Sequence, residues 1–564
     1  PYSRNIEYVD GKLQSRLGLE KMAAAALPDD ILCSQQYWKD LNSWFLMFAT
    51  CRDIVYYDFT NTRFVYLTPM YTTGTIEVKT GELTKVYGSG TSWNANLKAG
   101  DFIKIGAGDY YSSSTWYEVA SVDSDTLLTL TSAAPITAAS TAYAARQTFS
   151  GTDTALWSAV TFEDTTKGTI WVATNGYDTP VYWAGTGQVT ALTGLPTGFT
   201  CARYVNTFKD RLFFFWCVVG GENCPKLGYW SGIADCEDWT DTDFKLFVEG
   251  EDWITGSAVF SNYIVVFKEF KAYVGRWVGG DYTFDFDIST ECIGCYAGGS
   301  IVVTQGGIFY YGYDNKFHVF NILEDVSISD ELLEYTKDFN PNLEGNIVGD
   351  VWEWRNQIRW MVPYGETNVM NAVVVFDYNE KILQIWEYAE ANALSCMGSY
   401  VSVSQAYVDD TDWASKYVDE ETGYWDARQF LAGAPIMIYG GADGYVRKCD
   451  IGNDDDGSEF TRTFRTKRID FRKPHLYKRL QKQQWWFEKE TSGTITLKLK
   501  KNDNTDYDAL THSIDITSDT KDIVKKMVTW NRHAENFQFE LTSTCFFALL
   551  GFINVIHEER SSLC

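Results

Sequence analysis

One unit recurs along the chain and limits what it can fold into: an apolar strand, a polar turn, and a second strand rich in Tyr, Trp or Phe. Such strands are typical of half-buried pleated surfaces, and the Gly, Asn and Asp residues between them are typical of turns. Long amphipathic helical patterns are nearly absent. The sequence therefore predicts an all-β protein. Seven copies of the unit lie at residues 42–59, 168–183, 206–219, 261–277, 306–320, 355–378 and 434–450.

The spacing of these copies indicates a propeller. From residue 168 to residue 355 their successive starts lie roughly 40 to 55 residues apart, close to the length of one four-stranded propeller blade. The repeat is irregular and carries no Trp-Asp or kelch signature, so a β-sandwich or a chain of several β-domains would give similar spacing. We predict an irregular β-propeller-like core and leave its number of blades open.

Two stretches interrupt the series. Residues 72–147 are rich in Thr, Ser and Gly and read as short alternating strands, which predicts a small β-barrel or sandwich inserted after the first blade. The acidic run NDDDGSE (453–459) marks a boundary, after which the strand pattern changes and predicts a C-terminal β-sandwich. We expect an N-terminal segment and first blade at 1–71, the inserted domain at 72–147, the remaining blades at 148–455, and the sandwich at 456–564.

Charge and composition exclude some functions. The 564-residue chain has a formal net charge of −27, whereas nucleic-acid-binding domains are usually basic, because neutralised phosphates supply most of their affinity. An acidic surface is still suited to DNA that must slide past it. The chain contains no run of 18 apolar residues, so the sequence predicts no membrane-spanning helix. The N-terminus lacks a signal-peptide core and the twelve cysteines are scattered, which favours synthesis in a reducing cytoplasm.

Candidate catalytic and metal sites are weak. Cys292 and Cys295 form a Cys-x-x-Cys pair, but a structural zinc site needs four ligands and no second pair exists. A connection between two blades explains this pair better. The chain has no nucleophile elbow, no phosphate-binding loop and no calcium-loop frame around Gly457. We predict no enzyme activity, metal or cofactor. The five histidines are dispersed: His318, His475, His512, His533 and His557.

Two charged segments stand out. Residues 462–482 hold nine cations against the single acid Asp470, a local reversal in an acidic chain. They form either a strand edge protected by charge or a docking surface for an acidic neighbour or a second copy of this chain. The candidate interaction residues are Arg462, Arg465, Lys467, Arg468, Arg472, Lys473, Lys478 and Arg479. The second segment is an acidic loop that could face a channel or a partner, with Asp409, Asp410, Asp412, Asp419, Glu420 and Glu421.

With these pieces in place, the chain resembles the tail nozzle or hub proteins of short-tailed, podovirus-type bacteriophages, also described as DNA-stabilisation or tubular tail proteins. The stretch YVDGKLQSRLGLEKM (8–22) is similar to the family's N-terminal segment, and residues 293–332 resemble its strand, hairpin and short Ser-Asp helix. The inserted domain at 72–147 looks like those that decorate phage tail proteins. The segment FRTKRIDFRKPHLYKRLQKQQWWFE (464–488) looks like the start of the family's C-terminal module.

The resemblance implies a structural virion protein of the phage tail, assembled in the host cytoplasm. Six copies would form a ring below the portal and adaptor, extend the DNA channel, retain the packaged genome and pass it during ejection. Its partners would be other copies of itself, the head–tail adaptor, tail spikes, fibres or a needle, and DNA passing without sequence-specific contact. No residue-level site carries over.

Two alternatives stay open. A tail-associated polysaccharide-degrading enzyme would need two carboxylates at the separation that glycoside cleavage requires. A receptor-binding appendage would be trimeric and β-helical, and the irregular repeat argues against a regular solenoid.

Overall fold

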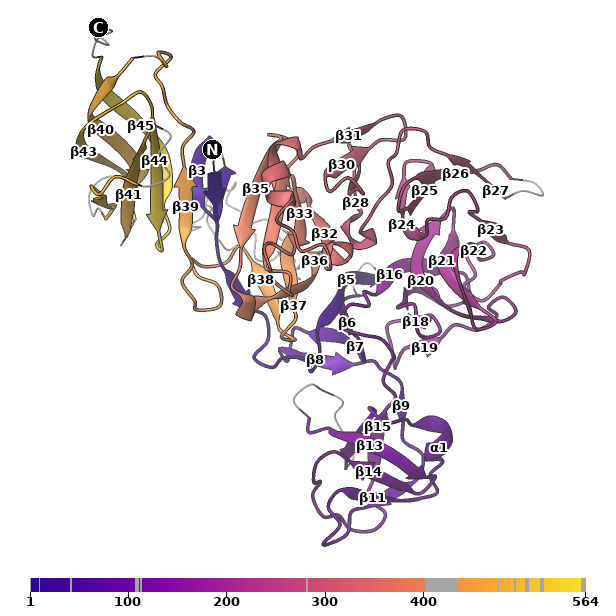
Figure 1. The fold of residues 1–564 in the computed structure, drawn as a ribbon. Helices are drawn as coiled ribbons and strands as arrows, with labels where there is room; N and C mark the ends of the chain where they lie inside the picture. The colour runs from indigo at the N-terminus through magenta and orange to yellow at the C-terminus, as the bar shows by residue number, and fades with distance from the viewer. Residues whose placement is uncertain are drawn as a thin grey trace, which may run out of the picture.

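The computed structural model describes residues 2–558 except 10, 41–42, 107–110, 112–113, 280–282, 402–434, 475, 491–492, 503–506 and 518–521. It is nearly all β, as predicted. A ring of blades occupies the middle of the molecule, a small domain hangs below it, and a two-sheet domain lies at its upper left (Figure 1). Among the described residues, no helix is long and apolar enough to cross a membrane.

The ring is a propeller of seven four-stranded antiparallel sheets. Each of the seven hairpins expected from the sequence falls in a different blade, which confirms the propeller. Blade 1 holds β5 Ile31–Asp40, β6 Ser43–Thr50, β7 Ile54–Asp58 and β8 Arg63–Tyr66; blade 2 holds β16 Ser158–Asp164, β17 Gly168–Thr174, β18 Val181–Trp183 and β19 Thr190–Ala191. Blade 3 holds β20 Phe199–Phe208, β21 Arg211–Val219, β22 Glu222–Trp230 and β23 Phe244–Leu246; blade 4 holds β24 Ile254–Phe260, β25 Tyr263–Lys268, β26 Ala272–Trp277 and β27 Phe284–Ile288.

The last three blades complete the ring. Blade 5 holds β28 Val302–Thr304, β29 Gly307–Tyr311, β30 Phe317–Phe320 and β31 Asp325–Ser327; blade 6 holds β32 Val348–Trp352, β33 Gln357–Val362, β34 Ala372–Asp377 and β35 Ile382–Glu387. Blade 7 holds β36 Leu394–Val401, β37 Pro435–Gly441, β38 Val446–Cys449 and, from the other end of the chain, β4 Leu19–Lys21. Strand β4 pairs antiparallel with β38, so the first residues of the chain close the ring.

Apolar packing between neighbouring blades holds the ring together. Each blade interface buries its own cluster, so seven clusters follow one another around the ring. Between blades 1 and 2, for example, Met47 packs with Trp171 and Trp183. The strands are apolar on both faces because each blade is covered on both sides, as the burial of every residue in Gln357–Val362 illustrates. The high aromatic content therefore fills the wedge-shaped spaces between blades.

The inserted domain is one seven-stranded sheet with the order β10-β11-β14-β13-β12-β15-β9. Its core surrounds Trp93, whose indole N–H donates to the Tyr143 hydroxyl at 3.0 Å. The strands are β9 Met70–Tyr71, β10 Thr75–Glu77, β11 Lys85–Ser89, β12 Phe102–Ile105, β13 Tyr117–Ser124, β14 Leu127–Leu130 and β15 Tyr143–Arg146, and α1 Trp93–Asn96 is its helix. Elsewhere in the part of the chain that the structure describes, helical structure is limited to α2 Leu333–Thr336 and 3-10 turns at Gly298–Ser300, Asp330–Leu332, Glu344–Asn346, Glu353–Arg355 and Glu390–Asn392.

The C-terminal domain is a sandwich of two five-stranded sheets, ordered β1-β39-β44-β41-β42 and β2-β3-β45-β40-β43. Its core includes Trp485, Trp530 and Phe539. The N-terminal strands are β1 Tyr2–Arg4, β2 Ile6–Val9 and β3 Lys12–Ser15. The C-terminal strands are β39 Arg462–Arg465, β40 Lys478–Glu488, β41 Thr494–Lys501, β42 His512–Asp515, β43 Ile523–Ala534, β44 Phe537–Ser543 and β45 Ala548–Glu558.

The N-terminal segment differs from the expected division of the chain. We grouped it with the first blade, but β1, β2 and β3 belong to the sandwich and β4 belongs to blade 7. Gly18 makes this passage possible, because a Cβ there would lie 1.7 Å from the Asp454 carbonyl oxygen. Twenty-one residues thus tie the propeller to the sandwich.

Candidate functional site

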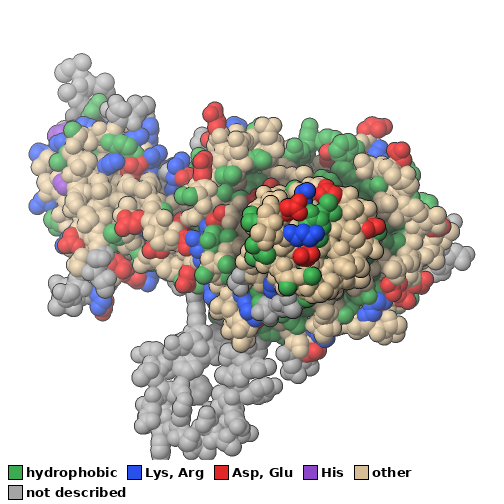
Figure 2. All heavy atoms as spheres, turned by 90° about the horizontal axis from the view of Figure 1, so that it is seen from below, with side chains coloured by type: hydrophobic (Ala, Val, Ile, Leu, Met, Phe, Trp, Pro, Cys, Tyr) green, Lys and Arg blue, Asp and Glu red, His purple; other side chains and the backbone are tan. Residues whose placement is uncertain are grey.

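The basic segment 462–482 passes from one sheet of the sandwich to the other. It begins with β39, which pairs with β1 and β44, and it ends in β40, the central partner of β43 and β45. Lys and Arg side chains lie on the sandwich at the left of Figure 2. The segment therefore contains interior positions as well as surface positions.

Three of the predicted interaction residues serve the sandwich itself. Arg462 is buried, donates from Nη2 to the Asn453 carbonyl at 2.5 Å, and also donates to the Thr544 carbonyl. Burial lowers the pKa of Arg462 to about 10. The buried Lys478 ammonium donates to the carbonyls of Leu476 at 2.8 Å and Glu535 at 2.7 Å. Arg465 pairs with Glu540 at 2.6 Å.

The other predicted cations lie toward solvent. Lys467, Arg468, Arg472 and Lys473 are exposed on the connection between β39 and β40, and Arg479 is half-buried on β40. Lys482, also in the segment, is exposed further along β40. The structure therefore separates a structural group from a surface group, which the sequence presents as one run.

The predicted acidic loop, with Asp409, Asp410, Asp412, Asp419, Glu420 and Glu421, lies outside the described residues. Its two flanking strands, β36 and β37, pair as the inner hairpin of blade 7. The described residues on either side of this segment therefore belong to the propeller rather than to the sandwich.

The propeller encloses a central cavity of about 600 Å³. The first strands of several blades line it, and Arg203 and Asp350 are the charged residues among the lining residues that the structure describes. Burial raises the pKa of Asp350 to about 6. Glycines bring the backbones together here: a Cβ at Gly298 would lie 1.7 Å from the Thr255 carbonyl oxygen. The described lining of this cavity is therefore mostly neutral, with one cation and one acid.

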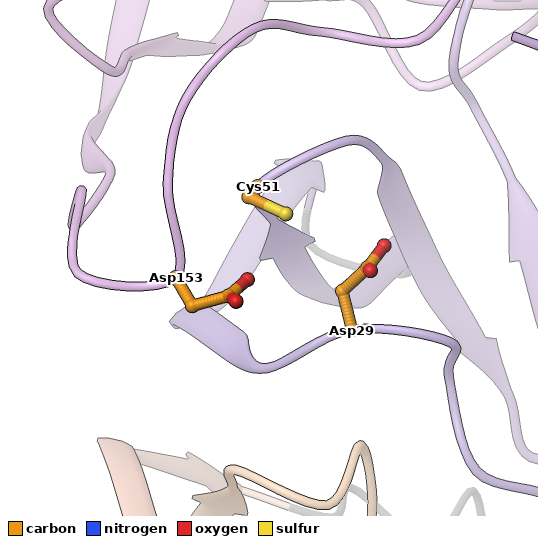
Figure 3. A group of neighbouring side chains, drawn as sticks. All are labelled: Asp29, Cys51 and Asp153. Atoms are coloured by element: carbon orange, nitrogen blue, oxygen red, sulfur yellow. The ribbon is translucent and has the colours of Figure 1, made fainter. Parts of the chain in front are cut away.

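A cluster of Asp29, Cys51 and Asp153 lies at the edge of the propeller (Figure 3), with one possible ligand atom of each within 4.8 Å of the others. Arg52 Nε donates to Asp29 at 2.9 Å, and Nη1 of the same guanidinium lies 3.7 Å from Glu118 of the inserted domain. Burial, followed by the nearby carboxylates, raises the pKa of the Cys51 thiol to about 12, whereas a metal requires thiolate. The adjoining hollow is about 90 Å³, below the ~300 Å³ of ordinary ligand sites. We assign the cluster a structural role around Arg52.

Cys292 and Cys295 lie in the connection between β27 of blade 4 and β28 of blade 5, as expected. Both are buried in the interface of these blades. Burial raises the pKa of both thiols to about 12. The Cys295 thiol donates to the Ala297 carbonyl at 3.1 Å, so this pair packs a turn.

A histidine between two carboxylates lies close to this connection. His318 of β30 is buried, with Nδ1 3.1 Å from Asp325 and Nε2 3.0 Å from Asp314. Burial lowers the pKa of His318, but the hydrogen bonds and charges of the two carboxylates outweigh burial and raise it above its ordinary value. Sequence reasoning missed this site, because the three residues belong to a turn and two strands.

We expect His318→Asn to lose stability in a pH-dependent way. Because the folded-state pKa is raised, the stabilisation by His318 is fully present below the unfolded pKa of about 6.5 and is lost as pH rises through the folded pKa. The difference in the free energy of unfolding between wild type and variant should therefore shrink from pH 6 to pH 9 in denaturant titrations. Asp314→Asn removes one of the two carboxylates beside His318. Its difference from wild type in the free energy of unfolding should therefore change less between pH 6 and pH 9 than that of His318→Asn. An equal difference at every pH would contradict the prediction.

Comparisons with known proteins show the fold type alone. No protein-family model and no curated protein matches the chain. Among solved structures, the phage phi92 endosialidase is 12% identical over 57% of this chain and 62% of its own, with a TM-score of 0.20, so the chain spans less than two thirds of that protein. The Neurospora crassa Pan2 WD40 domain is 10% identical over 68% and 90%, with a TM-score of 0.30. The extracellular domain of the two-component protein BT4673 from B. thetaiotaomicron is 9% identical over 94% and 76%, with a TM-score of 0.27. These similarities carry no argument about activity.

Proposed function

We propose that this chain is a structural subunit of a phage tail. Six copies would form the nozzle or hub ring below the portal and adaptor, extend the DNA channel, retain the packaged genome and pass it during ejection. The proposal begins from the sequence resemblance described above. It is supported by the way in which the N-terminal strands join the sandwich to the propeller.

The segment that resembles the family's N-terminus is also the part that joins two bodies of the subunit. Its strands complete both sheets of the sandwich, and β4 closes the propeller. Arg16 lies between the two bodies, where its guanidinium contacts Asp455 and the Glu387 carbonyl. A subunit held at a fixed angle in this way is suited to a load-carrying ring, in which neighbouring copies must keep one geometry.

The size of the central cavity indicates where DNA would pass. A cavity of about 600 Å³ is the size of a small-molecule pocket. Duplex DNA, in contrast, needs a continuous channel that is wider than the diameter of the double helix. In the proposed ring, the conduit is therefore the lumen between subunits. A net charge of −27 favours sliding, because few phosphates would be neutralised.

Quantitative cross-linking mass spectrometry of gradient-purified phage particles tests this function. We expect six copies of the chain, cross-linked to one another and to the adaptor ring. Three copies at the particle periphery would favour a receptor-binding appendage instead. Absence from the particle, or release of reducing sugar from host envelope polysaccharide by the purified chain, would contradict the structural role.

A further inference from the structure

The outward face of one sandwich sheet is unusually apolar. In β43, the residues that point away from the core include Ile523 and Met527, and Met527 is 60% exposed. Across the sheet, Met527 and Ile553 lie on opposite sides of Gln484, in one row perpendicular to the strands. Val555 extends this surface along β45. We call Ile523, Met527, Ile553 and Val555 the sandwich face.

This face lies on the reverse of a sheet that already has a core. Val524, Val528 and Trp530 alternate with the exposed residues of β43 and point inward. An antiparallel sheet with one buried face normally alternates apolar and polar residues, so apolar residues on both faces indicate a covered surface. The exposed cations Lys482 and Lys525 lie among the residues of the sandwich face: Lys525 lies between Ile523 and Met527 on β43, and Lys482 lies opposite Val555.

A second surface with exposed apolar residues is surrounded by acids, whereas the sandwich face carries lysines. It lies at the outer edge of blade 3, where Phe244, Leu246 and Val248 are exposed, on and just after the edge strand β23. Residues 238–253, which we call the blade 3 rim, hold six acids and the single cation Lys245. Asp238, Asp241, Glu249 and Glu251 of this rim are exposed. An exposed edge strand is also a surface that a neighbour can cover.

The two surfaces lie at opposite ends of the molecule. The sandwich is at the left of Figure 1, and β23 is at the right, on the far side of the propeller from the sandwich. One chain therefore cannot bring its own two surfaces together. Two different surfaces that meet between copies make a head-to-tail contact, which closes into a ring when its rotation closes.

We propose that the sandwich face of one copy binds the blade 3 rim of the next copy. This inference rests on the proposed ring and names the surfaces that build it. The apolar residues supply the buried centre of the contact, while Lys482 and Lys525 face the acids of the rim. Opposite charges set the register and the partner, and they make the association sensitive to salt.

Charge reversal on the full chain tests the contact. Sedimentation velocity measures the oligomers formed at rising protein concentration, at about 50 mM and about 500 mM salt. Wild type should form oligomers that weaken at the higher salt. The sandwich variant Lys482→Glu/Lys525→Glu makes the sandwich face acidic, and the rim variant Asp238→Lys/Asp241→Lys/Glu251→Lys leaves three acids and four cations in the blade 3 rim. Each variant should weaken self-association about 10- to 100-fold, because like charges then oppose each other.

Mixing the two variants separates this contact from a folding defect. Each variant presents two surfaces of the same sign, but an equimolar mixture restores opposite charges at every junction, so oligomers should return. The double variant Lys79→Glu/Lys381→Glu, at exposed positions of the inserted domain and blade 6, is the matched control and should assemble like wild type.

The outcomes distinguish this inference from the proposed function. A monomeric wild type, unaffected variants, or a mixture that stays monomeric would overturn the contact. If particles still hold six cross-linked copies, the ring function stands and another surface builds it. Absence from particles would contradict the ring function, whatever the sedimentation result.

Discussion

Arg16→Met should lower the free energy of unfolding by about 3 to 5 kcal/mol, because it leaves Asp455 buried without its cation. Arg16 is fully buried, and its Nη1 and Nη2 donate to Asp455 at 2.8 and 2.5 Å. Nε donates to Asn5 at 2.9 Å, and the guanidinium lies 3.7 Å from the ring centre of Phe460. Few side chains can replace this set of planar donors.

Thermal and denaturant unfolding measure the effect. Because Arg16 contacts both the sandwich and the propeller, the variant should lower the unfolding midpoints of both. Arg16→Lys should recover only part of the loss, since a lysine cannot form the paired contact with Asp455. Arg276→Met removes an exposed ion pair with Asp285 and is the control, with an expected loss below about 1 kcal/mol. If Arg16→Met lost as little stability as the Arg276→Met control, the contacts of Arg16 would contribute little to the free energy of unfolding.

Arg146→Met should loosen the inserted domain from blade 1, again at a cost of about 3 to 5 kcal/mol. Arg146 ends β15, and its Nε lies 3.0 Å from Oδ1 of Asp53 in blade 1, with both side chains buried. The guanidinium also lies 3.8 Å from the ring centre of Tyr66 in blade 1 and 4.7 Å from that of Trp116 in the inserted domain. Removing it leaves a buried carboxylate and an unfilled space between the two bodies.

Hydrogen exchange and limited proteolysis locate this effect. Protection should fall in β9, β15 and the strands of blade 1 next to the junction, while the sandwich stays unchanged. Asp53→Asn is the companion variant, and the double variant should lose less than the sum of the two, since the residues act as a pair. Unchanged protection in β15 would contradict the prediction.

Local patterns in the sequence predicted much of the fold. A hairpin in each blade was visible because its two strands and turn are consecutive, and the aromatic strands fit the blade interfaces. The first and last strands of the inserted domain along the chain, β9 and β15, were also close to the expected changes in composition at 72 and 147. These are features that neighbouring residues determine.

Pairings between distant residues could not be predicted in the same way. Strand β4 has only three residues, and nothing in LEK indicates that it pairs with β38 about 430 positions later. Arg16 belongs to the segment 8–22, for which the sequence predicts no interaction, and its partner Asp455 belongs to the run 453–459 that was interpreted as a boundary. Distant partners of this kind leave no periodic signal in a single sequence.

The candidate site was predicted only as a segment of chain. The run of cations at 462–482 was visible, but its sequence does not say that Arg462 and Lys478 point into the sandwich while Lys482 points outward. The apolar sandwich face was hidden for a similar reason. Met527 and Ile553 come from two strands that β40 separates, so they form a row only once the sheet exists.

Closure of the ring by β4 has a consequence for synthesis on the ribosome. The first strand needed for blade 7 emerges at residues 19–21, but its partner β38 is not made until residues 446–449. At ~5–20 residues per second, the early segment waits roughly 20 to 90 s with its backbone groups unpaired. During this time β1, β2 and β3 also lack their sheets. The nascent chain therefore exposes this unpaired strand segment while the propeller is being synthesised, and slow release or crowding of ribosomes should favour strand pairing between chains over closure of one ring.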